Sequence, residues 1–263
     1  MERVSKAQVK LIKSLQQKKY RDETNLFVAE GEKCVSELCK GFELVHLYRE
    51  GENATRSDIE QMSGLRTPQG VIGVFKKKIT NLQSPYGASR SEEITNGELV
   101  LALDGIQDPG NLGTIIRTCD WFGVRTIICS LDTADCYNPK VVQATMGALA
   151  RVHVHYTDLP AWLNEQMTND QMVNDQMVNI FGTLLDGRDM YEVLNTSNIK
   201  HQTSNIIIMG NEGNGISQAV RPYITHPIRI PSYPKNAETS ESLNVAIATA
   251  IVLAEFRHKF FQL

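Results

Sequence analysis

Short apolar runs alternate with helical patterns from residue 99 to residue 256, and this alternation restricts the possible folds more than any other feature of the chain. Six runs predict strands: Leu99–Leu103, Thr126–Cys129, Val152–Tyr156, Ile180–Leu184, Ile206–Met209 and Ile228–Ile230. Helical patterns follow several of them, at Leu112–Phe122, Lys140–Ala150 and Leu243–Phe256. Strands that alternate with helices favour a largely parallel sheet with helices on both faces. We therefore expect an α/β fold.

A turn-forming and poorly periodic stretch precedes this region, from about Ile79 to Gly97. Its Asn, Ser, Pro and Gly residues are typical of a linker. We expect a small N-terminal α/β domain over residues 1–80, a linker over 81–97 and a larger α/β domain over 98–263.

Composition excludes several classes of protein. The chain has 263 residues, of which 41% are hydrophobic and 22% charged, so wholesale disorder is excluded. The formal net charge of −3 means that a nucleic acid could be held only by a local basic patch. Five cysteines without a CxxC pair indicate reduced thiols in a cytosolic protein rather than disulfides or a zinc site. We therefore expect no bound metal. The most apolar stretch, Val245–Ala254, is too short to span a bilayer, so we also expect no membrane segment.

Basic residues gather in two places in the first 80 residues. The opening segment has the pattern of an amphipathic helix with a basic outer face, and a second cluster, Lys76-Lys77-Lys78, follows the strand-like run Val71–Phe75. The two clusters predict a contact face for RNA or DNA, although an ordinary solvated surface has the same pattern. The residues expected on this face are Lys18, Lys19, Arg21, Lys76 and Lys77.

Polar side chains follow a strand at the turn after Asp104. Asn111, Thr114 and Arg117 are spaced to share one face at the start of a helix, which suits the binding of a phosphate. The alternative is that Asn111 only caps the helix and Arg117 forms a surface ion pair.

Two further turns also follow a predicted strand and carry polar residues. A buried strand runs into the glycine-rich turn 210–215, in which Glu212 is the one charge, and the glycine spacing is not that of a dinucleotide-binding loop. In the third turn Ser242 is a candidate helix cap, and the amide of Asn244 needs a polar partner at the start of an apolar helix. Such turns meet at the carboxyl ends of parallel strands, where ligands bind.

These three turns together resemble the SpoU (TrmH-like) family of RNA 2′-O-ribose methyltransferases, of the SPOUT class. The resemblance is carried by residues 104–117, by Met209-Gly210-Asn211-Glu212-Gly213-Asn214-Gly215 and by Ser242-Leu243-Asn244-Val245-Ala246. Upstream, residues 27–33 and 67–71 resemble the family's N-terminal substrate-binding domain.

The resemblance implies S-adenosylmethionine as methyl donor, a homodimer with the site at the subunit interface, and a C-terminal trefoil knot. It also implies a role for each matched residue. The implied catalytic group is Asn111, Arg117, Glu212, Ser242 and Asn244; the implied cofactor-binding residues are Gly210, Asn211, Gly213, Ile230 and Leu243.

The expected activity is methylation of a ribose 2′-hydroxyl in structured ribosomal or transfer RNA, with guanosine favoured by family habit. The alternative is a non-catalytic RNA-binding or ribosome-assembly protein that keeps the fold. Gln143 and Thr145 stand where many relatives have Arg and Ser, which leaves the RNA target open. Three near-identical pentads over residues 164–178 predict a surface loop or a helix extension, with no function assigned.

Overall fold

The computed structural model describes residues 4–78, 99–173, 178–196, 205–234 and 240–260. They belong to two compact units. The first consists of Met1–Ile79, Asp108–Arg117 and Ala134–Val152, and the second of Thr80–Gln107, Thr118–Thr133 and His153–Leu263.

The first unit contains a three-stranded antiparallel sheet in the order β1 (Leu26–Glu30), β3 (Val71–Lys76), β2 (Leu44–Arg49). Its helices include α1 (Lys6–Ser14), α2 (Lys18–Thr24), α3 (Glu32–Leu38), α4 (Arg56–Met62) and α6 (Pro139–Thr145). A core of apolar side chains from α1, α4 and the sheet, including Ile12, Leu15, Val28, Ile59 and Ile72, joins the helices to the strands. Burial of these side chains is the main favourable contribution to folding of the unit.

The basic opening segment is helical, as the pattern predicted, but it forms two short helices. A capping box starts α1, because the side chain of Ser5 accepts from the N–H of Gln8 while the side chain of Gln8 accepts from the N–H of Ser5. The second helix, α2, ends at Thr24, and the next residue, Asn25, caps it in a left-handed backbone conformation (φ 56°).

The predicted helix Lys140–Ala150 is interrupted, and here the prediction was wrong. Helix α6 ends at Thr145, Met146 and Gly147 both have positive φ, and a single 3₁₀ turn follows at Ala148–Ala150. An α-helix cannot continue through left-handed residues, so the two pieces separate there.

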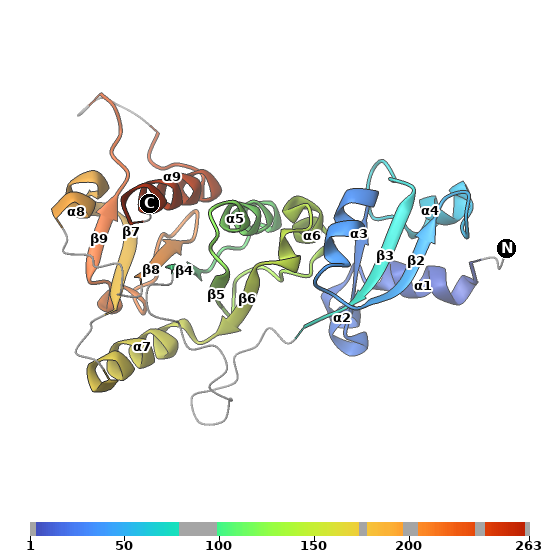
Figure 1. Ribbon diagram of the computed structural model, residues 1–263, viewed down its shortest axis with the longest axis horizontal. Helices are drawn as coiled ribbons and strands as arrows, with labels where there is room; N and C mark the ends of the chain where they lie inside the picture. Colours follow the sequence, from blue (N-terminus) through green and yellow to red (C-terminus); the bar gives the residue numbers. More distant parts are fainter. Residues whose placement is uncertain (1–3, 79–98, 174–177, 197–204, 235–239, 261–263) are drawn as a thin grey trace. The chain divides into compact units, whose positions relative to one another are not determined.

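The second unit contains a six-stranded sheet in which every pair of neighbours is parallel, as expected for an α/β fold (Figure 1). The strand order is β6 (His153–Thr157), β5 (Thr126–Ser130), β4 (Leu99–Asp104), β8 (Asn205–Gly210), β7 (Asn179–Asp189), β9 (His226–Arg229). The helices are α5 (Pro109–Trp121), whose first residues belong to the first unit, α7 (Leu159–Val173), α8 (Met190–Thr196) and α9 (Val245–Phe260). All six predicted strands are confirmed.

Helix α5 approaches α6 closely at Gly113. A Cβ on Gly113 would lie 2.5 Å from the Cβ of Ala144, so the contact between the two helices leaves no room for a larger residue there. The contact lies within the first unit, to which both residues belong, and it fixes the start of α5 against α6.

The direction of strand addition reverses between β4 and β8. The chain proceeds outwards from β4 to β5 and β6, whereas β8 lies on the other side of β4 and is followed by β7 and β9. In open α/β sheets the carboxyl ends of strands at such a reversal form the crevice in which ligands bind. Asp104 and Gly210, the last residues of β4 and β8, are paired at this point.

The repeated pentads lie partly in α7. The helix runs through the first two pentads to Val173, which agrees with a helix extension, and Asn174–Met177 of the third pentad lie outside the described residues. No helix of the described part of the chain is long and apolar enough to cross a membrane.

Candidate active site

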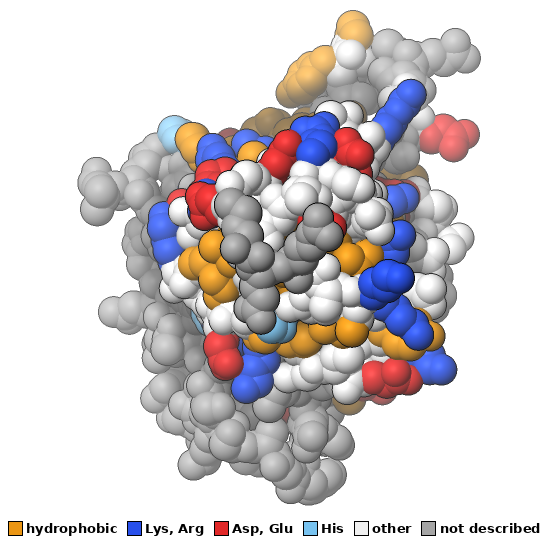
Figure 2. Space-filling view, turned by 90° about the vertical axis from the view of Figure 1, so that its right-hand side faces the viewer, with side chains coloured by type: hydrophobic (Ala, Val, Ile, Leu, Met, Phe, Trp, Pro, Cys, Tyr) orange, Lys and Arg blue, Asp and Glu red, His pale blue; other side chains and the backbone are white. Residues whose placement is uncertain are grey.

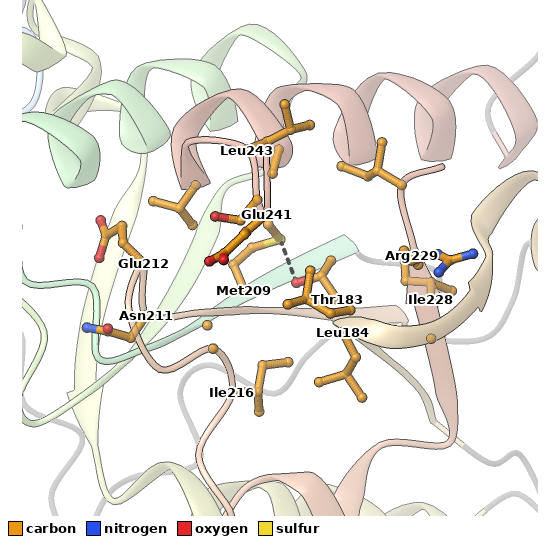
Figure 3. Close-up of a pocket in the computed structure, with 18 of the residues that line it drawn as sticks. Thr183, Leu184, Met209, Asn211, Glu212, Ile216, Ile228, Arg229, Glu241 and Leu243 are labelled. Atoms are coloured by element: carbon orange, nitrogen blue, oxygen red, sulfur yellow. Dashed lines mark hydrogen bonds between the residues drawn. The ribbon is translucent and has the colours of Figure 1, made fainter. Parts of the chain in front are cut away.

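A pocket of about 1150 Å³ lies at the carboxyl ends of the strands of the second unit. Most of its walls come from residues within four segments: 183–189 of β7, 209–216 at the end of β8 and beyond, 228–232 at the end of β9 and beyond, and 240–245 up to the start of α9. Glu192, Arg221 and Ala248 complete the lining. Figure 3 shows side chains from these segments around the same space, with Met209 and Thr183 at its centre. Thr183 is fixed there because its Oγ1 donates to the carbonyl of Ile208 at 3.1 Å and contacts Met209 Sδ at 3.6 Å.

The glycine-rich turn forms one wall of this pocket, and Gly210 makes its close approach possible. A Cβ on Gly210 would lie 2.3 Å from the carbonyl carbon of Gly215 and equally close to the amide nitrogen of Ile216. Any side chain at this position would therefore push the turn away from the strand. Gly215 itself has φ 66°, a left-handed conformation that favours glycine.

Asn211 holds the turn in shape. Its Nδ2 donates to the carbonyl of Gly105 at 2.6 Å, and its Oδ1 accepts from the N–H groups of Gly213 (2.8 Å) and Asn214 (3.1 Å). Its backbone N–H and carbonyl are both paired with Gly215. The polar groups of the Asn211 side chain are thus already hydrogen-bonded within the protein. They are therefore not free for the expected contact with a cofactor.

The end of β4 is tied to the same turn. Asp104 is 8% exposed, and its Oδ2 accepts from the N–H of Ser217 at 2.7 Å. This buried carboxylate is hydrogen-bonded across two segments, and a hydrogen bond to a charged acceptor is a strong one. Asp104 and Asn211 together set the spacing between the switch-point strands.

Seven of the ten predicted catalytic and cofactor-binding residues meet in this pocket. They are Gly210, Asn211, Glu212, Gly213, Ile230, Ser242 and Leu243. The other three have different places: Asn244 is not among the lining residues, and Asn111 and Arg117 belong to the first unit.

Asn244, not Ser242, caps helix α9. The Oδ1 of Asn244 accepts from the N–H groups of Ala246 (3.0 Å) and Ile247 (3.3 Å), and its carbonyl accepts from Ala248. The suggestion that Ser242 is the cap was wrong, because the helix starts two residues further on than a Ser242 cap requires. Ser242 is exposed and lines the pocket instead.

The helix that carries Asn111 and Arg117 is capped by a residue before it. The Oδ1 of Asp108 accepts from the N–H of Asn111 at 2.8 Å, with Pro109 as the first helical residue. The capping alternative for Asn111 is therefore wrong. Arg117 is exposed and has no hydrogen-bond or ion-pair partner within the described ranges, so the ion-pair alternative fails as well.

The predicted basic face is less basic than the sequence implied, and Arg21 is not part of it. Arg21 is 1% exposed, its Nη2 donates to Asp135 Oδ2 at 2.7 Å, and its Nη1 donates to the carbonyl of Leu15. A buried, paired guanidinium is unavailable to a polyanion, so the prediction for Arg21 was wrong.

The remaining basic residues have acidic neighbours. The ion pairs are Lys18–Asp22 at 2.6 Å, Lys19–Glu23 at 3.9 Å, Lys76–Glu43 at 3.4 Å and Lys77–Asp22 at 2.6 Å. Figure 2 shows Lys and Arg side chains beside Asp and Glu side chains in the upper part of one face, and a run of Lys and Arg side chains along the right-hand edge of that face. The Asp22 carboxyl is partly desolvated, but its hydrogen bonds to Lys18 and Lys77 outweigh that effect and hold its pKa below the usual value.

The sequence did not single out most of the other residues that line the pocket, among them Thr183, Arg229 and Glu241. Thr183 and Arg229 lie on strands and carry no motif, so nothing in the sequence distinguished them from other strand residues. Glu241 directly precedes Ser242, the first residue of the third motif. This neighbouring position was the one sequence signal that could have identified Glu241 as a pocket residue.

The residues present suit a cofactor of the size and polarity of S-adenosylmethionine. Apolar side chains with accessible surface (Leu185, Ile230, Leu243) can cover a purine ring, and the backbone of residues 210–215 can approach a ligand closely. Glu212 and Glu241 supply negative charge for a cationic ligand. Among the described residues, no group of three or more His, Cys, Asp and Glu side chains could hold a metal ion.

Comparison with known proteins places these features in a family. The family model described as SpoU rRNA Methylase family matches residues 98–254, and the MRM3-like substrate binding domain matches residues 6–59. Over 98% of both chains, the sequence is 30% identical to the Bacillus subtilis 23S rRNA (guanosine(2553)-2′-O)-methyltransferase RlmP.

A second relative is the 23S rRNA (guanosine-2′-O-)-methyltransferase RlmB of Neisseria meningitidis, which is 30% identical over 73% of this chain and 69% of its own length. Among solved structures, the AdoMet-bound rRNA methyltransferase from Sinorhizobium meliloti has a TM-score of 0.78 and 31% identity, covering 98% of this chain and 97% of that one.

Proposed function

The chain belongs to the SpoU rRNA methylase family, and from this membership we propose that it methylates a ribose 2′-hydroxyl of ribosomal RNA with S-adenosylmethionine as donor. The observation that carries the proposal is the convergence of turns after β8 and β9 and before α9 on one pocket, with Gly210, Glu212 and Ser242 in its wall. The names of the relatives favour guanosine as the target. The non-catalytic alternative is not favoured, because the pocket retains these residues.

S-adenosylmethionine, when bound, supplies an electrophilic methyl group on a positively charged sulfur. The protein then has to align the 2′-hydroxyl with that methyl and help the hydroxyl to lose its proton. We assign the alignment of the ribose to Asn111 and Ser242. Glu212 and Asn244 complete the proposed catalytic group, and Gly210, Gly213, Ile230 and Leu243 are the proposed contacts of the cofactor.

Arg117 is proposed as a clamp for the RNA phosphate that also stabilises the developing alkoxide. A guanidinium is protonated at all physiological pH values, so it serves poorly as a proton acceptor and well as a bidentate donor to a phosphate. Its exposure and its lack of a partner among the described residues support this role. The role requires Arg117 to reach the pocket of its own subunit or of a second one.

We also propose that the active form is a homodimer with a C-terminal trefoil knot, located in the cytoplasm, as the family resemblance and the bacterial relatives suggest. Large apolar side chains on the surface of the second unit support subunit association: Trp121 is 85% exposed and Leu131 is 71% exposed. The proposed contacts with RNA remain Lys18, Lys19, Lys76 and Lys77. The proposed domain boundaries remain 1–80 for the N-terminal domain, 81–97 for the linker and 98–263 for the methyltransferase domain.

The test of the proposed function is Arg117→Ala. Loss of one charge-stabilising donor is expected to lower methyl transfer by a factor of about 10² to 10³. Binding of S-adenosylmethionine, measured by calorimetry, should be unchanged, while incorporation of a tritiated methyl group into ribosomal RNA should fall. Arg125→Ala is the matched control, because Arg125 is an exposed arginine already paired with Asp120 at 3.1 Å. Full activity of the Arg117 variant would exclude the clamp.

A further inference from the structure

Glu241 is a pocket carboxylate to which neither the family comparison nor the proposed mechanism assigns a role. It lies between Leu243 and Met209 in the pocket wall (Figure 3). Within the described part of the chain it has no hydrogen-bond or ion-pair partner. Glu192, which lines the same pocket, differs in this respect because it is already engaged by another group of the protein. An unpaired carboxylate facing a ligand pocket is complementary to a cationic ligand group.

The donor of the proposed reaction offers two cations to such a carboxylate. S-adenosylmethionine carries a sulfonium at the reacting centre and an α-ammonium on its methionyl tail. The charge of the sulfonium disappears as the methyl group leaves, whereas the charge of the ammonium does not change during transfer. A carboxylate held against the sulfonium would stabilise the reactant more than the transition state and so slow the reaction. A carboxylate held against the ammonium binds both states equally.

From this asymmetry, and resting on the proposed function, we propose that Glu241 binds the α-ammonium group of the methionyl tail and thereby selects cofactors that carry an amino acid. The residue is a specificity-determining contact, distinct from the catalytic group. Two neighbouring residues of the same segment then have separate tasks: Ser242 faces the ribose of the RNA, and Glu241 faces the tail of the cofactor.

The experiment is calorimetric titration of the wild type and of Glu241→Gln with three ligands. S-adenosylmethionine has both cations, S-adenosylhomocysteine has only the ammonium, and 5′-methylthioadenosine has neither. Glutamine keeps the size and the acceptor oxygen but removes the charge. We expect the affinity for the first two ligands to fall by about tenfold. This is the lower end of the range for the loss of a hydrogen bond to a charged group, because Glu241 is exposed. The affinity for methylthioadenosine should stay the same.

Each other result overturns the proposal in a recognisable way. A loss confined to S-adenosylmethionine assigns Glu241 to the sulfonium, and an equal loss for all three ligands assigns it to the shape of the pocket. Unchanged affinity for all three, with weaker binding of RNA, assigns it to the substrate. Glu165→Gln, which removes a carboxylate of the second unit that does not line the pocket, is the control for a general change in charge and should alter none of the three affinities by more than about twofold.

The proposed function fails separately from this inference. A wild-type protein that binds none of the three ligands contradicts the methyltransferase assignment itself. A wild type that binds S-adenosylmethionine normally while Glu241→Gln also binds it normally contradicts only the role of Glu241.

Discussion

At the scale of single residues, the structure gives Asn211 a different task from the one its motif suggested. Its side chain makes three hydrogen bonds within the protein, one of which reaches Gly105 at the end of the neighbouring strand. Asn211 therefore acts on the cofactor through the shape of the turn, as a positioning residue.

Asn211→Asp tests this role. Aspartate keeps both acceptor bonds, but it replaces the donor to Gly105 with an oxygen that faces a carbonyl oxygen. We expect the free energy of unfolding to fall by about 1–3 kcal/mol, measured by urea denaturation, and the affinity for S-adenosylmethionine to fall with it.

Asn214→Asp is the control for the added charge. It introduces the same negative charge in the same turn, and the side chain of Asn214 has no partner among the described residues. Equal destabilisation of the two variants would attribute the effect to charge and would remove the positioning role from Asn211.

The amide of Asn244, at the start of an apolar helix, is explained by helix capping. Its Oδ1 caps two N–H groups at the start of α9, which is enough to account for the amide at this position. The catalytic role proposed for Asn244 therefore has to be tested against a structural one, by separating the stability of a variant from its activity.

At the scale of elements, the pocket depends on how closely the turn 210–215 approaches its own strand. The Cβ of an alanine at position 210 would overlap the backbone of Gly215 and Ile216, and a backbone has no alternative rotamer to adopt. The elements that contribute to the pocket are therefore held by packing that tolerates no added atom at that point.

Gly210→Ala should accordingly lower the free energy of unfolding by about 1–3 kcal/mol and reduce binding of S-adenosylmethionine. Gly213→Ala is the matched variant in the same turn, where a Cβ would meet only Asn211 Oδ1 at 3.5 Å, an ordinary contact distance. Thermal unfolding of the two proteins compares them directly. If Gly213→Ala is destabilised as much as Gly210→Ala, the close approach at Gly210 is not the cause.

At the scale of the whole molecule, charge is the property on which RNA binding depends. A net charge of −3 and ion-paired lysines leave the protein without a uniformly basic surface. Binding of a polyanion must then exchange Asp and Glu partners for phosphates, and the exchange is favourable only where several lysines act together.

Replacing Lys18 and Lys19 together by Gln tests this arrangement. Removal of one lysine–phosphate interaction should lower the slope of log K against log salt concentration by about 0.7–0.9, so the slope of the double variant is expected to be smaller by about 1.5. Fluorescence titration of an RNA fragment at several salt concentrations measures it. Arg56→Gln, which removes another exposed and paired cation of the first unit, should leave the slope unchanged. An unchanged slope in the lysine variant would place the RNA contacts elsewhere.

The sequence by itself determined the parallel α/β sheet, its six strands and the family, because hydrophobic alternation and turn motifs are local properties that neighbouring residues set. It also predicted seven residues of the pocket, since motifs after parallel strands must meet at one edge of the sheet.

Only the tertiary structure decided which polar groups remain available there. Burial and pairing of Arg21, capping by Asn244 and the commitment of Asn211 to the turn all depend on partners that folding brings close, such as Asp135, which lies 114 positions from Arg21. Strand order likewise depends on long-range pairing, so the exposed Glu241 acquires a place in the pocket only when the segments after β8 and before α9 lie together.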